Sequence, residues 1–518
     1  MAAPADRIFA NATVHPLADP DQTAEAVAVR DGAIVRVDSE YEVKFLEGTR
    51  TEWIDLDGGV VLPGFIDAHT HMQQLGQYLV HADLSAAETR SAVPEILERE
   101  ADPSHEWMLG FGYDESEWAE EARYPTADLL DQASRDRPVA AFRVDMHAAS
   151  LNSVALERLE DVLPESGLRQ AGGEPTGVVV EEGAEVVWDA IAPDRAETRE
   201  LLQAAIEFAH SKGVTGVHDM VRNSEAPGVY RELAVAGELD LRVRLNYWAD
   251  HLDAVEELGL RPNHGGAYVR TGAIKTYTDG SFGARTARLS DPYADDPDET
   301  GEWVRDPDSL ASLAEAVANA DQQLSAHAIG DEAIRAVLDA LDGISNSEQP
   351  DQEEARHRIE HVELLDDDLL DRVAASGAVA SVQPNFLRWA GKEGLYEQRL
   401  GAERRARTNR FRDMLDAGIP LAFGSDCMPL DPRFGIHLAV NAPVDSQRLS
   451  VTEALRAYTS GSAHAGFDED RLGTLEPGKR ADMVVLERSP WEHPERIDEI
   501  DIRMTVVDGA IVYEAGEQ

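Results

Sequence analysis

Residues 60–72 read VVLPGFIDAHTHM, and this stretch is the starting point for interpreting the whole chain. A short apolar run reaches a Pro-Gly pair, resumes, and ends on Asp67, His69 and His71. Alternate residues of a strand point to the same side, so we expect His69 and His71 to project together. Two neutral imidazoles at the end of a strand make half of a metal site. The remaining ligands must come from elsewhere in the chain.

Strand-like apolar runs recur after this stretch, and helical patterns separate most of them. In the segments 196–212, 308–320, 331–341 and 366–375, apolar residues recur at helical spacing. Strands that alternate with helices predict a parallel sheet, and eight strands fit a (β/α)₈ barrel. A doubly wound open sheet is the alternative, but no GxGxxG motif opens a helix. The eight predicted strands are 60–66, 214–218, 241–247, 269–275, 324–327, 358–363, 378–383 and 420–424.

The two ends of the chain share a different residue pattern, one that predicts short antiparallel strands. Valine and isoleucine alternate with polar residues in 7–56, in ADMVVLER (481–488) and in RMTVVDGAIVYEAG (503–516). Neither end has enough strands to bury a face alone, so we predict one small β-sandwich domain from 1–59 plus 470–518. The catalytic barrel would span 60–82 plus 197–469. Residues 83–196 are too many for a loop and would form an insertion domain that caps the catalytic end of the barrel.

The composition excludes several classes of partner. The net charge is −52, from 99 acidic and 47 basic residues, of which only five are lysine. The negative electrostatic field of such a chain repels the phosphates of nucleic acids, so nucleic-acid binding is disfavoured. The acid is spread along the chain, as in proteins of salt-accumulating halophiles, where high ionic strength screens the self-repulsion. We expect no membrane span and no export signal. With Cys427 as its one cysteine, the chain predicts a cytoplasmic protein.

Six potential metal ligands stand at the C-terminal ends of the predicted strands. A lone lysine is usually solvated, and a lone histidine is usually a satisfied polar group. Barrel enzymes, however, hold their chemistry at the face where these strand ends meet. Their shared position predicts one metal site rather than six unrelated residues. The six are His69, His71, Lys275, His327, His361 and Asp426.

Several motifs resemble the amidohydrolase superfamily, in the amidohydrolase family 3 branch that includes N-substituted formamide deformylases. They are LPGFIDAHTH, IKTYTDGSFGARTA, HAIGDEAI, RIEHVE, FGSD and LGTLEPGKRADMVVLE, and the resemblance covers nearly the whole chain. GFGYDESEW and RVDMHAASLNSVAL resemble the cap of that branch. Met146 replaces an expected glycine, and Cys427-Met428 replaces the more usual Ala-Pro after Asp426.

The resemblance implies that the histidines and Asp426 are metal ligands and that Lys275 bridges two ions as an N-carboxylated lysine. A free ammonium has donors and no acceptor, so it cannot coordinate. In the alternative, Lys275 stays an amine and the site holds one metal. Zinc suits imidazole and carboxylate ligands best, although iron, manganese or nickel would bind the same set.

The function that follows is metal-dependent hydrolysis of a C–N bond in an amide, N-formyl or cyclic amide. A bound divalent ion lowers the pKa of water from about 15.7 to near 7, and the resulting hydroxide attacks the carbonyl. Asp426 would act as general base and then acid, and His147 as oxyanion donor or substrate contact. Further candidates for substrate contacts are Tyr113, Asp114, Asn152, His218 and Gln383.

Other readings keep the barrel but change its task. The same site could catalyse ester hydrolysis, deamination or isomerisation, and a non-catalytic barrel could bind a small molecule or regulate a partner. A small-molecule substrate is expected in the enzymatic readings, and family resemblance implies a homodimer.

Overall fold

The computed structural model describes residues 3–19, 22–115, 118, 123–144, 148–222, 224–345 and 355–516. The chain folds into two compact units, Met1–His71 with Ile206–Gln518, and Met72–Ala205. The first unit holds the barrel and the sheets made by the two termini. The second holds the insertion, and the predicted insertion boundaries at 83 and 196 fall within it. None of the helices in the described part of the chain is long and apolar enough to cross a bilayer.

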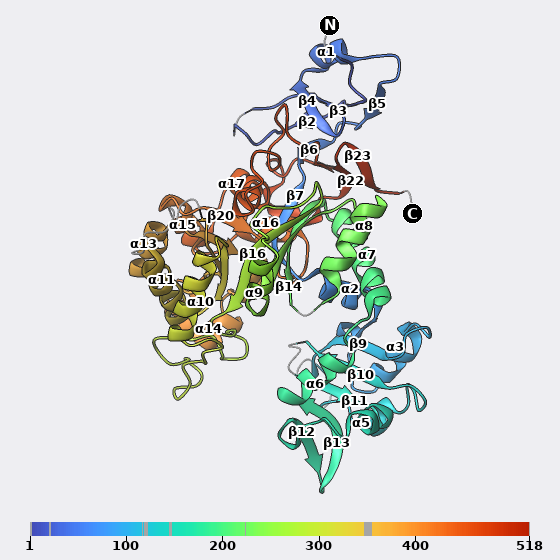
Figure 1. Ribbon diagram of the computed structural model, residues 1–518, viewed down its shortest axis with the longest axis vertical. Coiled ribbons are helices and arrows are strands. Elements are labelled where there is room, and N and C mark those ends of the chain that lie inside the picture. The colour runs from blue at the N-terminus through green and yellow to red at the C-terminus, as the bar shows by residue number, and fades with distance from the viewer. Residues whose placement is uncertain are drawn as a thin grey trace. The chain divides into compact units, whose positions relative to one another are not determined.

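Within the described residues, eight parallel strands form one sheet in the order β20-β19-β18-β17-β16-β15-β14-β7. The backbone N–H of Asp426, just past β20, donates to the carbonyl of His69 in β7 at 2.8 Å, so the two edge strands meet. The sheet is therefore a nearly closed barrel, as predicted (Figure 1). Its strands are β7 Phe65–Thr70, β14 Val214–Val221, β15 Arg242–Trp248, β16 Val269–Tyr277, β17 Leu324–Ala328, β18 Arg358–His361, β19 Val379–Val382 and β20 Leu421–Phe423.

Helices connect the barrel strands, and their ends carry local signals. Asp306 caps the helix that starts at Pro307, and Asp366 caps the one that starts at Asp367, each by accepting a backbone N–H. The four helices predicted from apolar spacing all form, with starts within one residue of the prediction. The helices of this unit include α8 Ala226–Ala236, α9 Leu252–Glu257, α10 Pro307–Asn319, α11 Asp331–Ser345, α13 Asp367–Ser376, α14 Leu395–Arg405, α15 Phe411–Asp416, α16 Pro432–Val440, α17 Val451–Arg456 and α18 Ser462–Ala465, and α7 Arg195–Ser211 leads into them.

The predicted first barrel strand, 60–66, has the wrong bounds. The chain forms two strands there: β6 (Val60–Pro63) pairs antiparallel with β21 (Met483–Leu486), and the barrel begins only with β7. Gly64 lies between them, and a Cβ at this position would come within 2.3 Å of the Thr215 side chain. Because a side chain at position 64 would clash with Thr215, the chain passes from one sheet to the next at a glycine.

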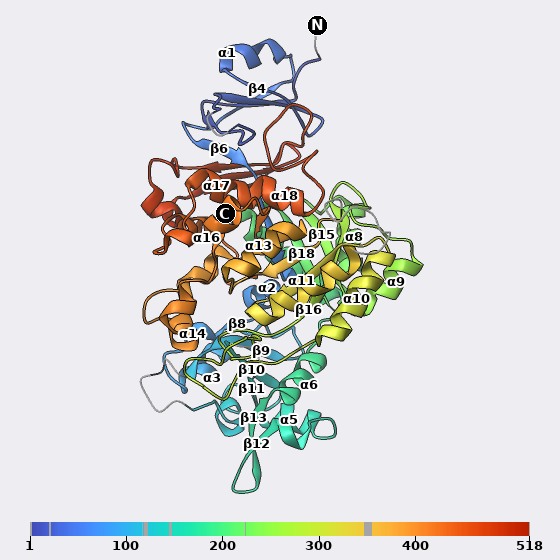
Figure 2. The same ribbon diagram turned by 90° about the vertical axis from the view of Figure 1, so that its left-hand side faces the viewer.

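The two termini together build the predicted β-sandwich. Its sheets have the orders β4-β3-β1-β5 and β2-β6-β21-β22-β23, so N- and C-terminal strands lie side by side (Figure 2). Val27, Val61 and Val485 bury their side chains in one shared core, which stabilises the association by the hydrophobic effect. The strands are β1 Arg7–Ala10, β2 Thr13–Val14, β3 Ala26–Arg30, β4 Ala33–Asp38, β5 Glu52–Asp55, β6, β21, β22 Ile502–Val507 and β23 Ala510–Glu514.

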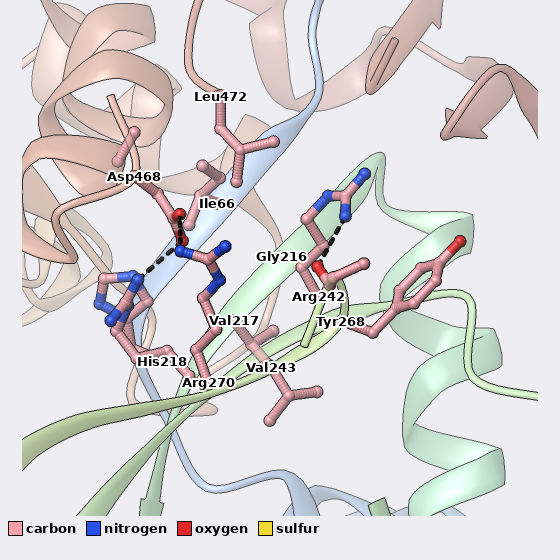
Figure 3. Close-up of a pocket in the computed structure, with 13 residues that line it drawn as sticks. Ile66, Gly216, Val217, His218, Arg242, Val243, Tyr268, Arg270, Asp468 and Leu472 are labelled. Carbon is pink, nitrogen blue, oxygen red and sulfur yellow. Dashed lines mark hydrogen bonds and ion pairs between the residues drawn. The ribbon is translucent and has the colours of Figure 1, made fainter. Parts of the chain in front are cut away.

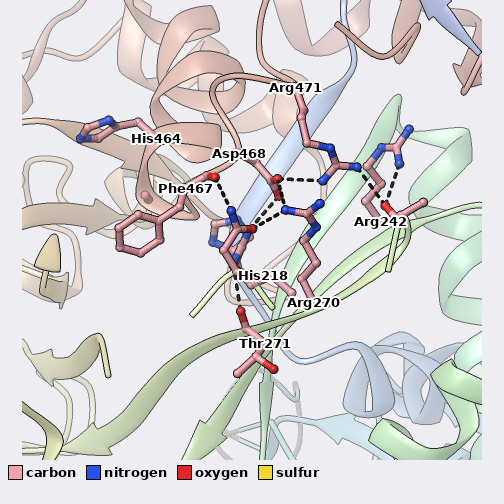
Figure 4. A network of polar contacts seen from close by, with 12 residues as sticks. His218, Arg242, Arg270, Thr271, His464, Phe467, Asp468 and Arg471 are labelled. Atoms are coloured by element: carbon pink, nitrogen blue, oxygen red, sulfur yellow. Dashed lines mark hydrogen bonds and ion pairs between the residues drawn. The ribbon is translucent and has the colours of Figure 1, made fainter. Parts of the chain in front are cut away.

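Arginine–aspartate pairs fasten the C-terminal segment to the N-terminal ends of the barrel strands. Arg242 at the start of β15 donates from Nη2 to Oδ1 of Asp482 at 2.8 Å. Asp468 pairs with Arg244 at 2.7 Å and with Arg270 at 3.2 Å, and Figure 4 shows Asp468 beside Arg270. A small cavity beside these pairs is lined by Ile66 and other early strand residues (Figure 3). It therefore lies at the opposite end of the barrel from the C-terminal strand ends, and it is not the predicted active site.

The second unit is built on a mixed sheet in the order β12-β13-β11-β10-β9-β8. An aromatic cluster forms its core, in which the Phe142 and Trp188 ring centroids lie 4.3 Å apart. Its elements include α2 Met72–Val80, β8 Ala82–Asp83, α3 Ala92–Glu100, β9 Met108–Tyr113, α4 Ala127–Leu130, β10 Val139–Arg143, β11 Ala148–Leu151, α5 Ser153–Leu159, β12 Leu168–Ala171, β13 Glu174–Val180 and α6 Glu182–Ala190.

Candidate metal centre

Three of the predicted ligands form a compact group at the C-terminal ends of the barrel strands. Ligand atoms of His69, His361 and Asp426 all lie within 4.8 Å of one another. His71 joins them, with its Nε2 3.2 Å from Oδ1 of Asp426. Lys275, fully buried on β16, brings its Nζ to 3.4 Å from His69 Nε2.

His327 lies next to this group. Its ring centroid is 4.4 Å from that of His361, and its Nε2–H donates to the Gly280 carbonyl at 3.0 Å. That bond leaves Nδ1 as the lone-pair nitrogen, and among the described residues this buried atom has no hydrogen-bond partner. The structure thus brings all six predicted ligands together, while their role as ligands stays a prediction.

Glu360 orients the first of these histidines. Its Oε2 lies 2.7 Å from His69 Nδ1, and because a carboxylate only accepts, Nδ1 must carry the proton. The other nitrogen, Nε2, is then free toward Asp426 and Lys275. A carboxylate behind a histidine is the arrangement that fixes the tautomer of metal-binding imidazoles.

A buried ionic network supports Glu360 from inside the barrel. Arg358, which is fully buried, pairs through Nε with Glu360 Oε1 at 2.8 Å. Its Nη1 donates to His218 Nδ1 at 2.8 Å, and its Nη2 donates to Ser381 at 2.8 Å. His218 therefore reaches the ligand group only through Arg358 and Glu360 in these contacts; its predicted substrate contact stays a prediction.

The backbone holds two of the predicted ligands in uncommon conformations. His361 has φ +73° and Asp426 has φ +52°, and the residue after each is also left-handed. Such conformations cost about 1–3 kcal/mol per residue and persist where the surroundings enforce them. Asp67 is part of that enforcement, because its Oδ1 accepts the N–H of both His69 and Ser425 at 3.0 Å.

Burial and mutual charge set the protonation of the group. Burial lowers the pKa of His69 to about 4 and the pKa of Lys275 to about 8. Burial alone would raise the pKa of Asp426, but the neighbouring histidines hold that pKa well below its usual value. Burial likewise holds the pKa of His361 well below its usual value, so at neutral pH His69 and His361 are neutral imidazoles and Asp426 is an ionised carboxylate, the forms that bind a metal.

These residues fit a divalent metal ion. Imidazole nitrogens and a carboxylate oxygen are ligands that zinc and similar ions favour. His361 Nδ1, like His327 Nδ1, is buried without a hydrogen-bond partner in the described ranges. Leaving a buried nitrogen without a hydrogen-bond partner destabilises the folded protein. A bound cation would satisfy both nitrogens.

The remaining predicted site residues have varied surroundings. Gln383 follows β19, is 1% exposed, and neither of its amide atoms has a partner among the residues described. Ser381, two residues earlier on the same face, points into the barrel toward Arg358, so Gln383 projects inward nearer the ligands. His147 lies outside the described residues.

The other three candidates belong to the second unit and have structural partners there. Tyr113 is buried with its hydroxyl 3.3 Å from that of Ser150, and Asp114 pairs with Arg143 at 3.2 Å. The buried Asn152 caps α5 by accepting the N–H of Ala155 at 2.9 Å. Their predicted contacts with a substrate stay predictions.

Asp67, Arg358 and Glu360 were missed as functional residues in the sequence. Asp67 and Glu360 lie inside quoted motifs, but no partner could be assigned to them. A usable signal was present, because Arg358 and Glu360 are two residues apart on a predicted strand of a buried sheet and so point to the same side. Two opposite charges buried on one side are expected to form an ion pair.

Comparisons with known proteins agree with this geometry. The amidohydrolase family model matches residues 52–513. The chain is 33% identical to the Bacillus subtilis (strain 168) protein named amidohydrolase YtcJ, over 96% of this chain and 97% of that protein. It is 28% identical to the N-substituted formamide deformylase of Arthrobacter pascens, over 98% of each chain.

A solved structure shares the fold. A metal-dependent hydrolase from Pyrococcus furiosus superposes with a TM-score of 0.80 at 31% identity, covering 94% of this chain and 99% of that one. With the family model matching most of the sequence and a barrel that gathers imidazoles and a carboxylate at one end, the chain belongs to the amidohydrolase family.

Proposed function

We propose that this protein hydrolyses the C–N bond of a small-molecule amide, N-formyl compound or cyclic amide with the help of a bound divalent metal, for which zinc is the best match. The observation that carries the proposal is the group formed by His69, His361 and Asp426, whose ligand atoms lie within 4.8 Å of one another. The name of the Arthrobacter relative, a formamide deformylase, supports a C–N bond as the target.

His69, His71, His327, His361, Lys275 and Asp426 would hold the metal. When bound there, a divalent ion supplies Lewis acidity, which polarises a carbonyl and lowers the pKa of water to about 7. Asp426 is ionised at neutral pH and can accept the proton of the attacking water and return it to the leaving nitrogen. Glu360 keeps His69 in one tautomer throughout.

Lys275 is proposed to be N-carboxylated. Burial lowers its pKa to about 8, so part of the amine is neutral near that pH and can attack carbon dioxide. A new N–C bond forms, the amine loses a proton, and the side chain becomes an anionic oxygen ligand. Its position 3.4 Å from His69 Nε2 supports a bridging role.

The test is a substrate screen with the zinc-loaded, full-length protein in molar salt. N-formyl amines, N-acyl amino acids, ureides and aryl esters would be compared by the release of amine or alcohol. We expect turnover of at least one C–N substrate and a loss of about 10²–10⁴-fold in Asp426→Asn. The exposed Asp445→Asn is the control and should match the wild type. Turnover of aryl esters alone would overturn the proposal.

A further inference from the structure

A cation and two aromatic rings lie beside the predicted ligands at the catalytic end of the barrel. Arg222 directly follows β14, Trp248 ends β15 and Tyr277 ends β16. The Tyr277 ring centroid is 4.4 Å from that of His327 and 4.8 Å from Lys275 Nζ. The ring centroids of Trp248 and Tyr277 are 5.2 Å apart, and Arg222 Cζ lies 5.6 Å from the Trp248 centroid. The three side chains therefore form one row that starts at the predicted ligands and ends on a guanidinium.

The strand register sets the length of this row. Trp248 is opposite Lys275 where β15 pairs with β16, and β14 pairs with β15 as far as Val221, the residue before Arg222. Neighbouring strands lie about 4.8 Å apart, so the backbones of Arg222 and Lys275 are about 10 Å apart. A small organic molecule that reaches the predicted ligands with one end can therefore contact the long side chain of Arg222 with the other.

No carboxylate in the described part of the chain balances the charge of Arg222. With the residues described here it makes neither an ion pair nor a hydrogen bond, and its contact is the face of Trp248. Other arginines of the barrel strands are paired: Arg244 lies 2.7 Å from Asp468, and Arg358 lies 2.8 Å from Glu360. The chain has 99 acidic and 47 basic residues, so carboxylates are abundant. Arg222 is thus a cation at the catalytic end that is available to an anion from outside the chain.

A carboxylate is the group that this arrangement fits. A guanidinium presents its N–H donors in a planar fork that matches the two oxygens of a carboxylate. An arginine held over an aromatic face uses no N–H donor for that contact, so the fork of Arg222 stays available to a ligand. Trp248 and Tyr277 are only partly buried, and their rings offer an apolar surface to the part of a ligand that lies between the carboxylate and the predicted metal ligands.

We propose that Arg222 binds a carboxylate of the substrate and thereby selects amides that carry this anion, such as N-formyl amino acids, over neutral amides. The inference rests on the proposed function, because it assigns a substrate feature to the same site. The amide carbonyl would lie at the predicted metal ligands, and the apolar part of the substrate would pack against Trp248 and Tyr277. Arg222 would thus determine specificity without contacting the bond that breaks.

The experiment compares N-formylphenylalanine with N-formyl-2-phenylethylamine, which differ by the carboxylate alone, on the zinc-loaded, full-length protein. We expect kcat/KM to be at least about tenfold higher for the anionic substrate. In Arg222→Met this ratio should fall below about twofold through a higher KM for the anionic substrate. Arg222→Lys should keep part of the ratio, because it retains the charge and loses the planar fork. Arg50→Met, at an exposed turn before β5, is the matched control and should keep the full ratio.

Binding is also measured without turnover, by calorimetric titration of both formamides into Asp426→Asn. The anionic formamide should bind at least about tenfold more tightly, and adding Arg222→Met should remove the difference. Equal binding of the two formamides, or a preference that survives Arg222→Met, overturns the proposal and leaves Arg222 an ordinary exposed arginine. Failure of the proposed hydrolysis gives a different result: neither formamide is cleaved by the wild type, while binding of the anionic one still depends on Arg222.

Discussion

Glu360 and His69 show how the candidate metal centre depends on a buried residue outside the predicted ligand set. The carboxylate accepts the proton-bearing nitrogen of His69 and balances the buried charge of Arg358. One side chain therefore fixes the tautomer of the predicted ligand His69 and pairs with the Arg358 guanidinium inside the barrel. The two roles are separable by experiment, because one affects metal affinity and the other affects stability.

We expect Glu360→Gln to weaken zinc binding in the barrel by about 10–100-fold, because the amide no longer enforces the tautomer. The free energy of unfolding should also fall by about 3–5 kcal/mol, because Arg358 loses its buried counter-charge. Chelator competition and urea unfolding measure the two effects. Glu257→Gln, at an exposed helix end, should change neither. Unaltered zinc affinity in Glu360→Gln would show that Glu360 does not orient His69.

The metal-free protein should lose stability as the pH falls from about 6.5 to about 4. His69 has a pKa of about 4 when folded and 6.5 as a free side chain, so in this range the unfolded chain binds the extra proton. The contribution of neutral His69 to the free energy of unfolding is complete above pH 6.5 and amounts to at most about 3 kcal/mol. Urea unfolding of His69→Gln should show a shallower loss, and the exposed His264→Gln should behave as the wild type. Equal slopes in all three would refute the assignment.

The grouping of the six predicted ligands could be inferred from the sequence because the carboxyl ends of parallel barrel strands all lie at one face. Residues far apart, such as Lys275 and Asp426, could therefore be grouped without coordinates. The supports of the site were only partly predictable. Arg358 and Glu360 share one face of a single predicted strand, but the contact of Glu360 with His69 and that of Arg358 with His218 each join different strands and follow only from the barrel order. The left-handed backbone at His361 and Asp426 was also unpredictable, because it is enforced by tertiary contacts and not by residue type.

At the scale of elements, the seam between β20 and β7 positions Asp426 beside His69. Gly424 lies in this seam, and a Cβ there would come within 2.5 Å of the His69 backbone nitrogen. Gly424→Ala should therefore shift β7 and lower both zinc affinity and stability, the latter by about 1–3 kcal/mol. Gly343→Ala, on α11 with open space around it, should be neutral or slightly stabilising. Zinc titration and thermal unfolding compare the two; equal behaviour would contradict the role of the seam.

Element boundaries were predicted less well than element types. The alternation of strands and helices was predicted correctly, because the spacing of apolar residues is a feature of each local segment of sequence. The split of 60–66 into β6 and β7 was missed because β6 and the first two residues of β7 are apolar and buried, so the sequence there looks like one continuous strand. Gly64 was the available signal: a glycine inside a strand pattern often marks a close approach of another segment.

At the scale of the whole molecule, the net charge of −52 should make stability depend on salt. Self-repulsion among surface carboxylates weakens as the Debye length falls from about 10 Å at 0.1 M to about 3 Å at 1 M. We expect Tm to rise by several degrees between 0.1 and 3 M KCl. NaCl at equal ionic strength should act alike, because screening depends on ionic strength. A Tm that is constant or falls with salt would contradict a stability limited by charge repulsion.

The most direct test of a metal-dependent hydrolase is to titrate zinc into the metal-free protein while amide turnover is followed. Turnover should rise in proportion to the zinc bound in the barrel and level off when the site is full. In His361→Ala both the barrel zinc and the turnover should be lost, with turnover falling by at least about 10³-fold. Full turnover by the metal-free protein, or wild-type zinc binding and turnover in His361→Ala, would contradict a catalytic metal at His69, His361 and Asp426.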